Sequence, residues 1–218
     1  ANTVVPVTRS LFNSLFVVAV GSVGHIVLAS LCAYPLAKYK FPGCKFFNQI
    51  IVYSLMFNAT VTMIPNFLTI ASLGMLDSQW AIIIPGFAST LGLYLMKNFM
   101  EQIPDSLMEA AQIDGAGYLR IHFTIVMPVV KPALVTAFIL VFQAFWTNTG
   151  DKFIYTEARK GFAYVVGQLA NGKISGVGSS YAGISAASAV IMFAVPLVVF
   201  LLMQNNVVST MATSGMKE

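Results

Sequence analysis

The chain has 218 residues, of which 57% are hydrophobic and only 9% are charged, and its mean hydropathy is +0.79. Soluble globular domains carry about 25% charged residues, so this chain cannot cover a surface that faces water. In a membrane protein, a net charge of +4 is typical of basic residues in the loops, which set the orientation of the spans, and does not indicate nucleic-acid binding. We therefore expect an all-α integral membrane protein that contacts lipid and no nucleic acid.

Five apolar segments predict five transmembrane helices, because a bilayer core of about 30 Å requires about 20 apolar residues in a helix. Together they form a polytopic helix bundle that makes up a single domain over residues 1–218. In chain order, the segments are Leu11–Lys38, Phe46–Leu76, Ser78–Met96, Pro132–Gly150 with a start as early as Thr124, and Tyr181–Gln204.

Prolines lie within or at the edge of several of these spans, and proline has no backbone N–H to donate. A helix that contains proline therefore leaves a carbonyl group free, and inside a membrane a neighbouring group must bond to it. Each such site predicts either ordinary helix bending or a hinge. The prolines concerned are Pro65, Pro85, Pro128, Pro132 and Pro196.

A basic cluster after the first span predicts the side of the membrane on which each loop lies. It consists of Lys38, Lys40 and Lys45. Basic loops stay in the cytoplasm, and each span changes the side. We therefore expect the loop 103–128 and the tail 207–218 in the cytoplasm, and the loop 151–173 and the N-terminus outside. An outside N-terminus without a signal sequence predicts a further helix ahead of this sequence.

The cytoplasmic loop begins with the signals of a short helix from Asp105 to about Ile113. Asp105 or Ser106 is the expected N-cap, and Glu109 stands at the capping-box distance from Ser106. Glycine tolerates the left-handed geometry of a helix end, so Gly115 is the expected terminator. A carboxylate is unfavourable at the negative end of a helix. Asp114 is therefore expected to cap a second helix, which starts near Ala116 and enters the membrane.

The short helix predicted in this loop carries small residues at its centre, Ala110 and Ala111, with Gly115 at its end. Small residues allow a close approach by a partner, and Glu109 adds a charged anchor at the edge. The alternative is an amphipathic helix that lies on lipid. Acidic residues outnumber basic ones here, and anionic lipid would repel them. The pattern therefore favours a protein socket.

These residues also resemble the EAA loop of ABC importer permeases, which reads E-A-A, three residues, G, nine residues, I-x-L-P. The spacing agrees throughout, with Met127 where leucine is usual. The residues that carry the likeness are Glu109-Ala110-Ala111, Asp114-Gly115-Ala116, Ile125 and Pro128, with Lys131-Pro132-Ala133 after them. Two further patches resemble permeases of maltose-type oligosaccharide importers, namely Leu36–Tyr39 with Phe41–Gly43, and Trp146-Thr147-Asn148.

The resemblance implies the type I importer permease fold, here with the family's first helix missing, in the cytoplasmic membrane of a bacterium. It also implies a second permease subunit, an ATPase dimer and an extracellular solute-binding protein that delivers a sugar. ATP and Mg²⁺ would be bound by the ATPase, because this chain contains no GxxxxGK[ST] loop. The loop would be the coupling helix, and the residues expected to contact the ATPase are Glu109, Ala110, Ala111, Asp114 and Gly115.

Polar and aromatic residues in the spans are candidates for a solute pathway, since amides and hydroxyls bind sugars and aromatic rings stack on them. The polar candidates are Asn58, Thr60, Thr62, Asn66, Gln143 and Asn148, and the aromatic candidates are Phe145 and Trp146. The same side chains can instead tie helices together. His25 lies within a span, where an ionisable side chain is a functional candidate, but no carboxylate in the same span pairs with it, which favours a satisfied neutral histidine. His122 is expected at a helix start facing the cytoplasm, without a special role.

Two other classes of protein remain as alternatives. An intramembrane enzyme would use a serine and a histidine, for which Gly176-Val177-Gly178-Ser179 offers only a weak pattern. A channel, or a transporter that does not use ATP, would need no EAA loop. The two cysteines, Cys32 and Cys44, match no metal or disulfide pattern, so no metal site is expected.

Overall fold

The computed structural model describes residues 6–57, 59–170 and 182–214, and within these ranges the regular structure is entirely helical. The helices are α1 (Val7–Lys38), α2 (Cys44–Met56), α3 (Ala59–Ser72), α4 (Trp80–Phe87), α5 (Thr90–Glu101), α6 (Asp105–Ile113), α7 (Tyr118–Ile121), the π-helix η1 (His122–Val126), α8 (Met127–Val129), α9 (Lys131–Trp146), the 3₁₀ turn η2 (Glu157–Arg159), α10 (Phe162–Ala170) and α11 (Ala182–Ser214).

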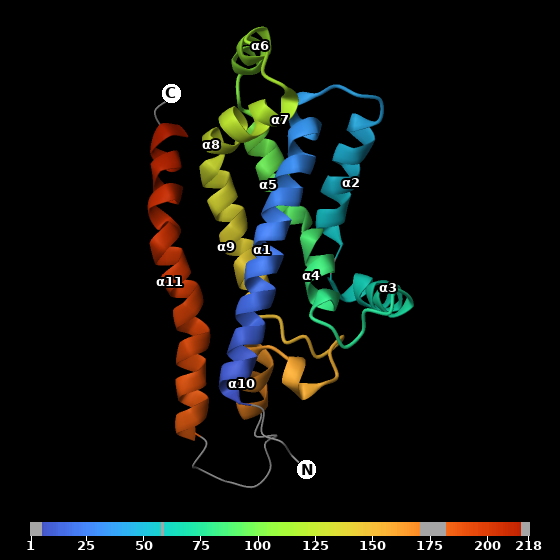
Figure 1. The fold of residues 1–218 in the computed structure, drawn as a ribbon, viewed down its shortest axis with the longest axis vertical. Helices are drawn as coiled ribbons and strands as arrows, with labels where there is room; N and C mark the ends of the chain where they lie inside the picture. The colour runs from blue at the N-terminus through green and yellow to red at the C-terminus, as the bar shows by residue number, and fades with distance from the viewer. Residues whose placement is uncertain (1–5, 58, 171–181, 215–218) are drawn as a thin grey trace.

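Helix α1 is the centre of the bundle, and α4, α5, α9 and α10 pack around it (Figure 1). Its buried face consists largely of small residues, which let neighbouring helices approach closely. They include Ser10, Ser14, Gly21, Ser22, Ala29, Ser30 and Ala33. The all-α bundle expected from the composition is confirmed.

Three of the predicted spans are long apolar helical segments, found at Val7–Lys38, Trp80–Glu101 and Gly183–Gln204. The third lies in α11, and only 6% of its most apolar 18-residue stretch is buried within the chain. The other two predicted spans fall on pairs of helices that are sharply bent relative to one another.

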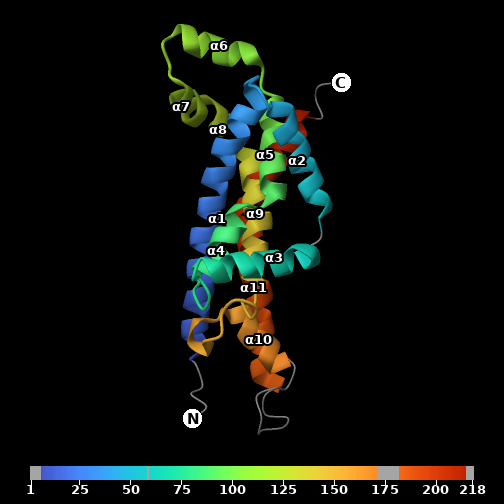
Figure 2. The same cartoon turned by 90° about the vertical axis from the view of Figure 1, so that its right-hand side faces the viewer.

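The first of these bends corrects the prediction of one continuous span over Phe46–Leu76. Helix α2 ends at Met56, and α3 follows at an angle of 111°. Phe57 has the extended backbone geometry φ −78°, ψ 125°, which no α-helix contains. As a result α3 lies across the axis of the bundle (Figure 2).

The second bend corrects the expected start of the fourth span near Thr124. The segment Tyr118–Val129 meets α9 at 80°, and α9 begins only at Lys131. Pro132 has no N–H to donate to the carbonyl group of Pro128, so helical hydrogen bonding is interrupted at this point. The second helix of the loop therefore does not run straight into α9.

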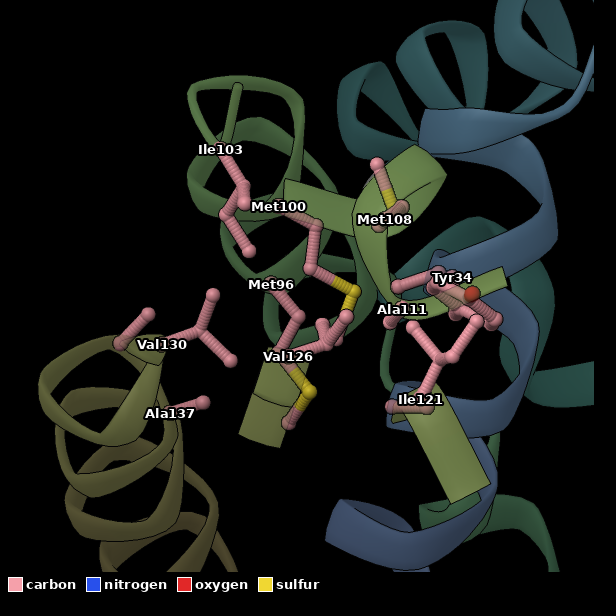
Figure 3. Packing of buried hydrophobic residues seen from close by; sticks show 13 residues of the cluster. Tyr34, Met96, Met100, Ile103, Met108, Ala111, Ile121, Val126, Val130 and Ala137 are labelled. Carbon is pink, nitrogen blue, oxygen red and sulfur yellow. The ribbon is translucent and has the colours of Figure 1, made fainter. Parts of the chain in front are cut away.

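The two loops that were assigned to opposite sides of the membrane lie at opposite ends of the bundle. Helices α6 and α7 lie at one end, and the described part of 151–173, with η2 and α10, lies at the other (Figure 1). A buried apolar cluster fills each end. The one near α6 is shown in Figure 3 and includes Tyr34, Met96, Met100, Met108, Ala111, Ile121 and Val126.

Candidate functional site

Helix α6 has the predicted bounds, but its start is built differently from the prediction. Pro104 is the N-cap residue, and no side chain caps the helix. Asp105 lies in the first turn, where its Oδ1 is 2.9 Å from Nζ of Lys38. The expected cap by Asp105 or Ser106 is therefore wrong, because the ammonium group of Lys38 engages the Asp105 carboxylate.

The end of α6 confirms the role expected of Gly115, which has φ +79°. Its N–H donates to the carbonyl of Gln112 (3.0 Å), and the N–H of Ala116 donates to that of Ala111 (2.9 Å). This pair of bonds is the Schellman motif of a helix end. Asp114 is the C-cap of α6, while Gly117 is the N-cap of α7. The prediction that Asp114 caps the next helix is thus wrong.

Helix α6 has two apolar faces. Met108 and Ala111 face the bundle and are 6% and 9% exposed. Ala111 lies beside Tyr34 and Ile121 (Figure 3). Leu107 and Ile113 face away from the bundle and are 47% and 86% exposed. A helix that uses only one apolar face for its own fold has the other available for a partner.

The five residues expected to contact an ATPase are therefore divided between these faces. Glu109, Ala110, Asp114 and Gly115 are exposed, whereas Ala111 is buried within the chain. The small size of Ala111 serves the packing of α6 on its own bundle. Sequence reasoning did not select Leu107 and Ile113, although helical periodicity places both on the side of Ala110.

Next to α6, the π-helix η1 holds His122, which was expected to face the cytoplasm. His122 is instead fully buried, and its ring lies 5.1 Å from that of Tyr34 and 4.9 Å from that of Phe123. Neither ring nitrogen has a hydrogen-bond partner among the residues that the structure describes. π-Helical turns are rare and frequently mark functional regions of a helix.

A pocket of about 350 Å³ opens between α4, α5 and α9. Its polar lining comes from Asn66, Ser89 and Asn148, and its apolar lining includes Leu140 and Phe145. The Oδ1 atom of Asn148 accepts a bond from the N–H of Gly150 at 2.9 Å. Its amide nitrogen donates to no group among the described residues, so it is suited to a hydroxyl-bearing solute.

The candidates for the solute pathway are placed in different ways. Asn148 lines this pocket, whereas Gln143 and Thr62 are exposed side chains that do not line it. Asn58 lies outside the described residues. Asn66 and Phe145, which were also candidates, line the pocket. Ser89 is a lining residue that was not selected, because only the break between α4 and α5 brings it to α9.

Trp146 does not line the predicted solute pathway, because it is only 1% exposed and is hydrogen-bonded within the chain. Its indole N–H donates to the carbonyl of Met192 at 3.0 Å. In α11 that carbonyl would normally bond to the N–H of residue 196, but Pro196 has none. Trp146 thus satisfies the carbonyl that Pro196 frees and fixes α9 to α11, so it has no surface left for a solute.

The alternative of an intramembrane serine enzyme finds no support in the described residues. His25 is fully buried, and its Nδ1 is 2.9 Å from the carbonyl oxygen of Phe87. Neither His25 nor His122 is bonded to a serine there, and the segment 176–179 lies outside the described residues. Within the described ranges, no group of three histidine, cysteine or acidic residues is placed to hold a metal ion.

At the opposite end of the bundle, Asp77 organises the loop that follows α9, which we name the outer loop after the side of the membrane predicted for it. Its carboxylate accepts bonds from the N–H groups of Tyr155 (3.0 Å) and Thr156 (2.8 Å), from the Thr156 hydroxyl (2.6 Å) and from Arg159 (3.1 Å). The bonds from Thr156, followed by those from Tyr155 and Arg159, hold the pKa of Asp77 below its usual value. Asp77 therefore ties the α3–α4 turn to the loop that follows α9.

Comparison with known proteins gives one consistent family. The model of the binding-protein-dependent transport system inner membrane component matches residues 10–213. The polygalacturonan/rhamnogalacturonan transport system permease protein YtcP of Bacillus subtilis is 37% identical over 147 residues, which are 67% of this chain and 51% of that protein. The sn-glycerol-3-phosphate transport system permease protein UgpE of Yersinia pestis is 33% identical over 204 residues, 93% of this chain and 72% of that protein.

The fold is also similar to chains of solved ABC transporter structures. A chain from a bacterial ABC transporter involved in the import of the acidic polysaccharide alginate superposes with a TM-score of 0.75 at 28% identity, covering 90% of this chain and 73% of that one. A chain of the inward-facing MetNI methionine ABC transporter superposes with a TM-score of 0.68 at 15% identity, covering 93% and 95%, and shows the shared fold alone. Several curated relatives are matched over only about half their length. The family match covers nearly the whole chain, and the chain belongs to the binding-protein-dependent transport system inner membrane components.

Proposed function

We propose that this chain is a permease subunit of an ATP-driven importer, which moves a sugar or oligosaccharide delivered by an extracellular solute-binding protein. The observation that carries the proposal is the geometry of α6. It is a nine-residue helix at one end of the bundle, ended by a left-handed glycine, with an apolar face that its own chain leaves uncovered. Such a helix is suited to seat in a cleft of a second protein.

The ATPase would contact the outer face of α6, defined here as Leu107, Glu109, Ala110 and Ile113. Leu107 and Ile113 supply apolar surface on either side of Ala110, whose methyl group lets a partner approach the backbone. Buried apolar anchors at the centre of an interface contribute most of its binding energy. ATP and Mg²⁺ belong to the partner in this proposal, and this chain transmits motion without performing chemistry.

The names of two relatives support a carbohydrate as cargo, while UgpE is named for sn-glycerol-3-phosphate. YtcP is described by its polygalacturonan and rhamnogalacturonan transport system, and the alginate importer by an acidic polysaccharide. The polar groups of the pocket in this chain are two amides and one hydroxyl, which suit the hydroxyls of a sugar. A second permease subunit would close the pathway on its open side. Another small solute remains the alternative cargo.

The proposal is tested by replacing Ala110 with arginine and comparing it with Gln112→Arg. Both residues are exposed on α6, but they lie on different sides of the helix. Ala110→Arg is expected to weaken association with the ATPase by about tenfold or more, as for a central interface residue. Gln112→Arg is expected to behave as the wild type. Co-purification from the native membrane and solute uptake by cells measure the two effects.

Substitution of Gly115 provides an independent test of whether the end of α6 serves the coupling to the ATPase. Apart from its two chain neighbours, no atom of the described residues lies within 4 Å of a Cβ added there, so the cost of substitution comes from φ +79°. Asparagine tolerates this geometry, whereas valine does not. Gly115→Asn is expected to retain more uptake than Gly115→Val. Equal uptake by both variants and the wild type would refute the coupling role of Gly115. Purification of the chain as a homo-oligomer without an ATPase would refute the proposed function.

A further inference from the structure

The end of α1 beside α6, which is predicted to be cytoplasmic, holds the start of the loop that contains α6. Lys38 is the last residue of α1, and its side chain is only 4% exposed. Its Nζ donates to Oδ1 of Asp105 at 2.9 Å, to the backbone carbonyl of Ile103, and to that of Glu101 at 3.4 Å. A lysine has three N–H donors, so all of them are used on the turn between α5 and α6.

The same end of α1 also holds the segment that follows α6. The hydroxyls of Tyr34 and Tyr39 are 2.9 Å apart. The Tyr39 ring packs edge-on against Tyr118 at 5.4 Å, and the Tyr34 ring lies 5.1 Å from His122. Tyr118 and His122 are the first residues of α7 and η1. The end of α1 therefore contacts the chain on both sides of α6. Lys38 contacts the turn before α6, and Tyr34 and Tyr39 contact the segment after it.

The opposite end of α1 is bonded to the outer loop. Nδ2 of Asn13 donates to the carbonyls of Ala158 (3.0 Å) and Lys160 (3.2 Å). The Ser14 hydroxyl accepts a bond from the N–H of Phe162 at 2.8 Å in a buried setting. The same loop is held from its other side by Asp77, so it forms a bonded unit at the outer end of the bundle.

Between these ends α1 is a single helix of 32 residues, which is about 48 Å long at 1.5 Å per residue. Its one internal proline, Pro35, lies in the last turn. The route along the chain from α6 to α9 is not continuous in this way, because it passes through a π-helix and then an 80° bend. A displacement of α6 is therefore transmitted more directly to α1 than to α9.

We propose that α1 is a strut that couples the ATPase-contacting loop to the outer loop, with Lys38 and Asn13 as the positioning residues at its two ends. The proposal rests on the proposed function, since it requires an ATPase on α6 and a solute-binding protein at the outer end. In this proposal, α1 transmits the signal between the two sides of the membrane, and α9, which follows the loop that contains α6, does not.

The test measures whether the binding protein outside stimulates the ATPase inside. The complete transporter is reconstituted in liposomes, and ATP hydrolysis is measured with and without the native binding protein, purified with its endogenous solute. Lys38→Met and Asn13→Leu keep the approximate size of each side chain and remove its hydrogen bonds. Stimulation is expected to fall by about fivefold or more in both, the lower range of typical allosteric couplings, while subunit association and unstimulated hydrolysis stay unchanged.

Lys38→Arg is expected to restore stimulation, because arginine also donates to several acceptors. Lys40→Met is the matched control, since Lys40 is exposed two residues further on. Wild-type stimulation in both Lys38→Met and Asn13→Leu would overturn the strut. Loss of subunit association or of unstimulated hydrolysis in step with stimulation would also overturn it, because the residues would then serve folding alone. A wild-type complex that lacks an ATPase altogether would instead refute the proposed function.

Discussion

The bond between Trp146 and the carbonyl of Met192 gives a prediction with a worked magnitude. Trp146→Phe removes the indole N–H that donates to that carbonyl, whose regular helical partner, residue 196, is a proline without an N–H. An unsatisfied buried carbonyl costs about 1–3 kcal/mol, and the smaller ring adds the loss of some packing. At roughly 2–4 °C per kcal/mol for a chain of this size, a cost of about 2 kcal/mol lowers the melting temperature by about 4–8 °C.

The assay is thermal unfolding of the purified protein in detergent, followed by circular dichroism at helical wavelengths. Trp80→Phe is the matched control, because Trp80 is 47% exposed, and it is expected to shift the midpoint very little. Pro196→Ala supplies the missing N–H from within α11. In that background, Trp146→Phe is expected to cost less, by about 1 kcal/mol or more. An equal cost of Trp146→Phe in both backgrounds would show that the carbonyl does not depend on the indole.

Two further predictions concern the outer loop and the helix packing. Asp77→Gly keeps the backbone with φ +58° accessible but removes the acceptor, so the amides of 155–156 should lose protection from hydrogen exchange. Because the pKa of Asp77 is lowered in the folded state, its contribution to stability is present at neutral pH. That contribution is lost as the pH falls through the lowered pKa, and persistent protection in more acidic solution would contradict this. Gly86→Ala places a Cβ 2.2 Å from the ring tip of Phe145, and overpacking of about 1–3 kcal/mol should lower the melting temperature, whereas Gly167→Ala, with nothing within 4 Å, should not.

The parts of the site that the sequence predicts well are those set by neighbours along the chain. The bounds of α6 and the left-handed Gly115 follow from a proline before the helix and a glycine after it. These are backbone properties of the residues themselves, and they act within one turn. The general arrangement of apolar helices and the separation of the two loops also follow from composition and charge.

The errors concern contacts between segments distant in sequence. Asp105 was expected to cap its own helix, but its partner Lys38 is 67 positions away in the chain. Trp146 was expected to face a solute, but its indole N–H donates to the backbone carbonyl of Met192 in another helix. Hydropathy alone does not distinguish a straight span from two apolar helices joined at a bend, so the turn of α3 across the bundle was also missed.

The sparse burial of α11 has a consequence for the membrane itself. The apolar segment Gly183–Gln204 has 22 residues and would be about 33 Å long as a straight helix, against a hydrocarbon thickness of about 30 Å. Because so little of this segment is held by the interior of the chain, its tilt should respond to lipid as well as to protein contacts. The tilt of α11 would then depend on the thickness of the bilayer. Shorter acyl chains would favour a more inclined α11, and the bond between Trp146 and Met192 would be the pivot that keeps the helix attached to the bundle while it leans.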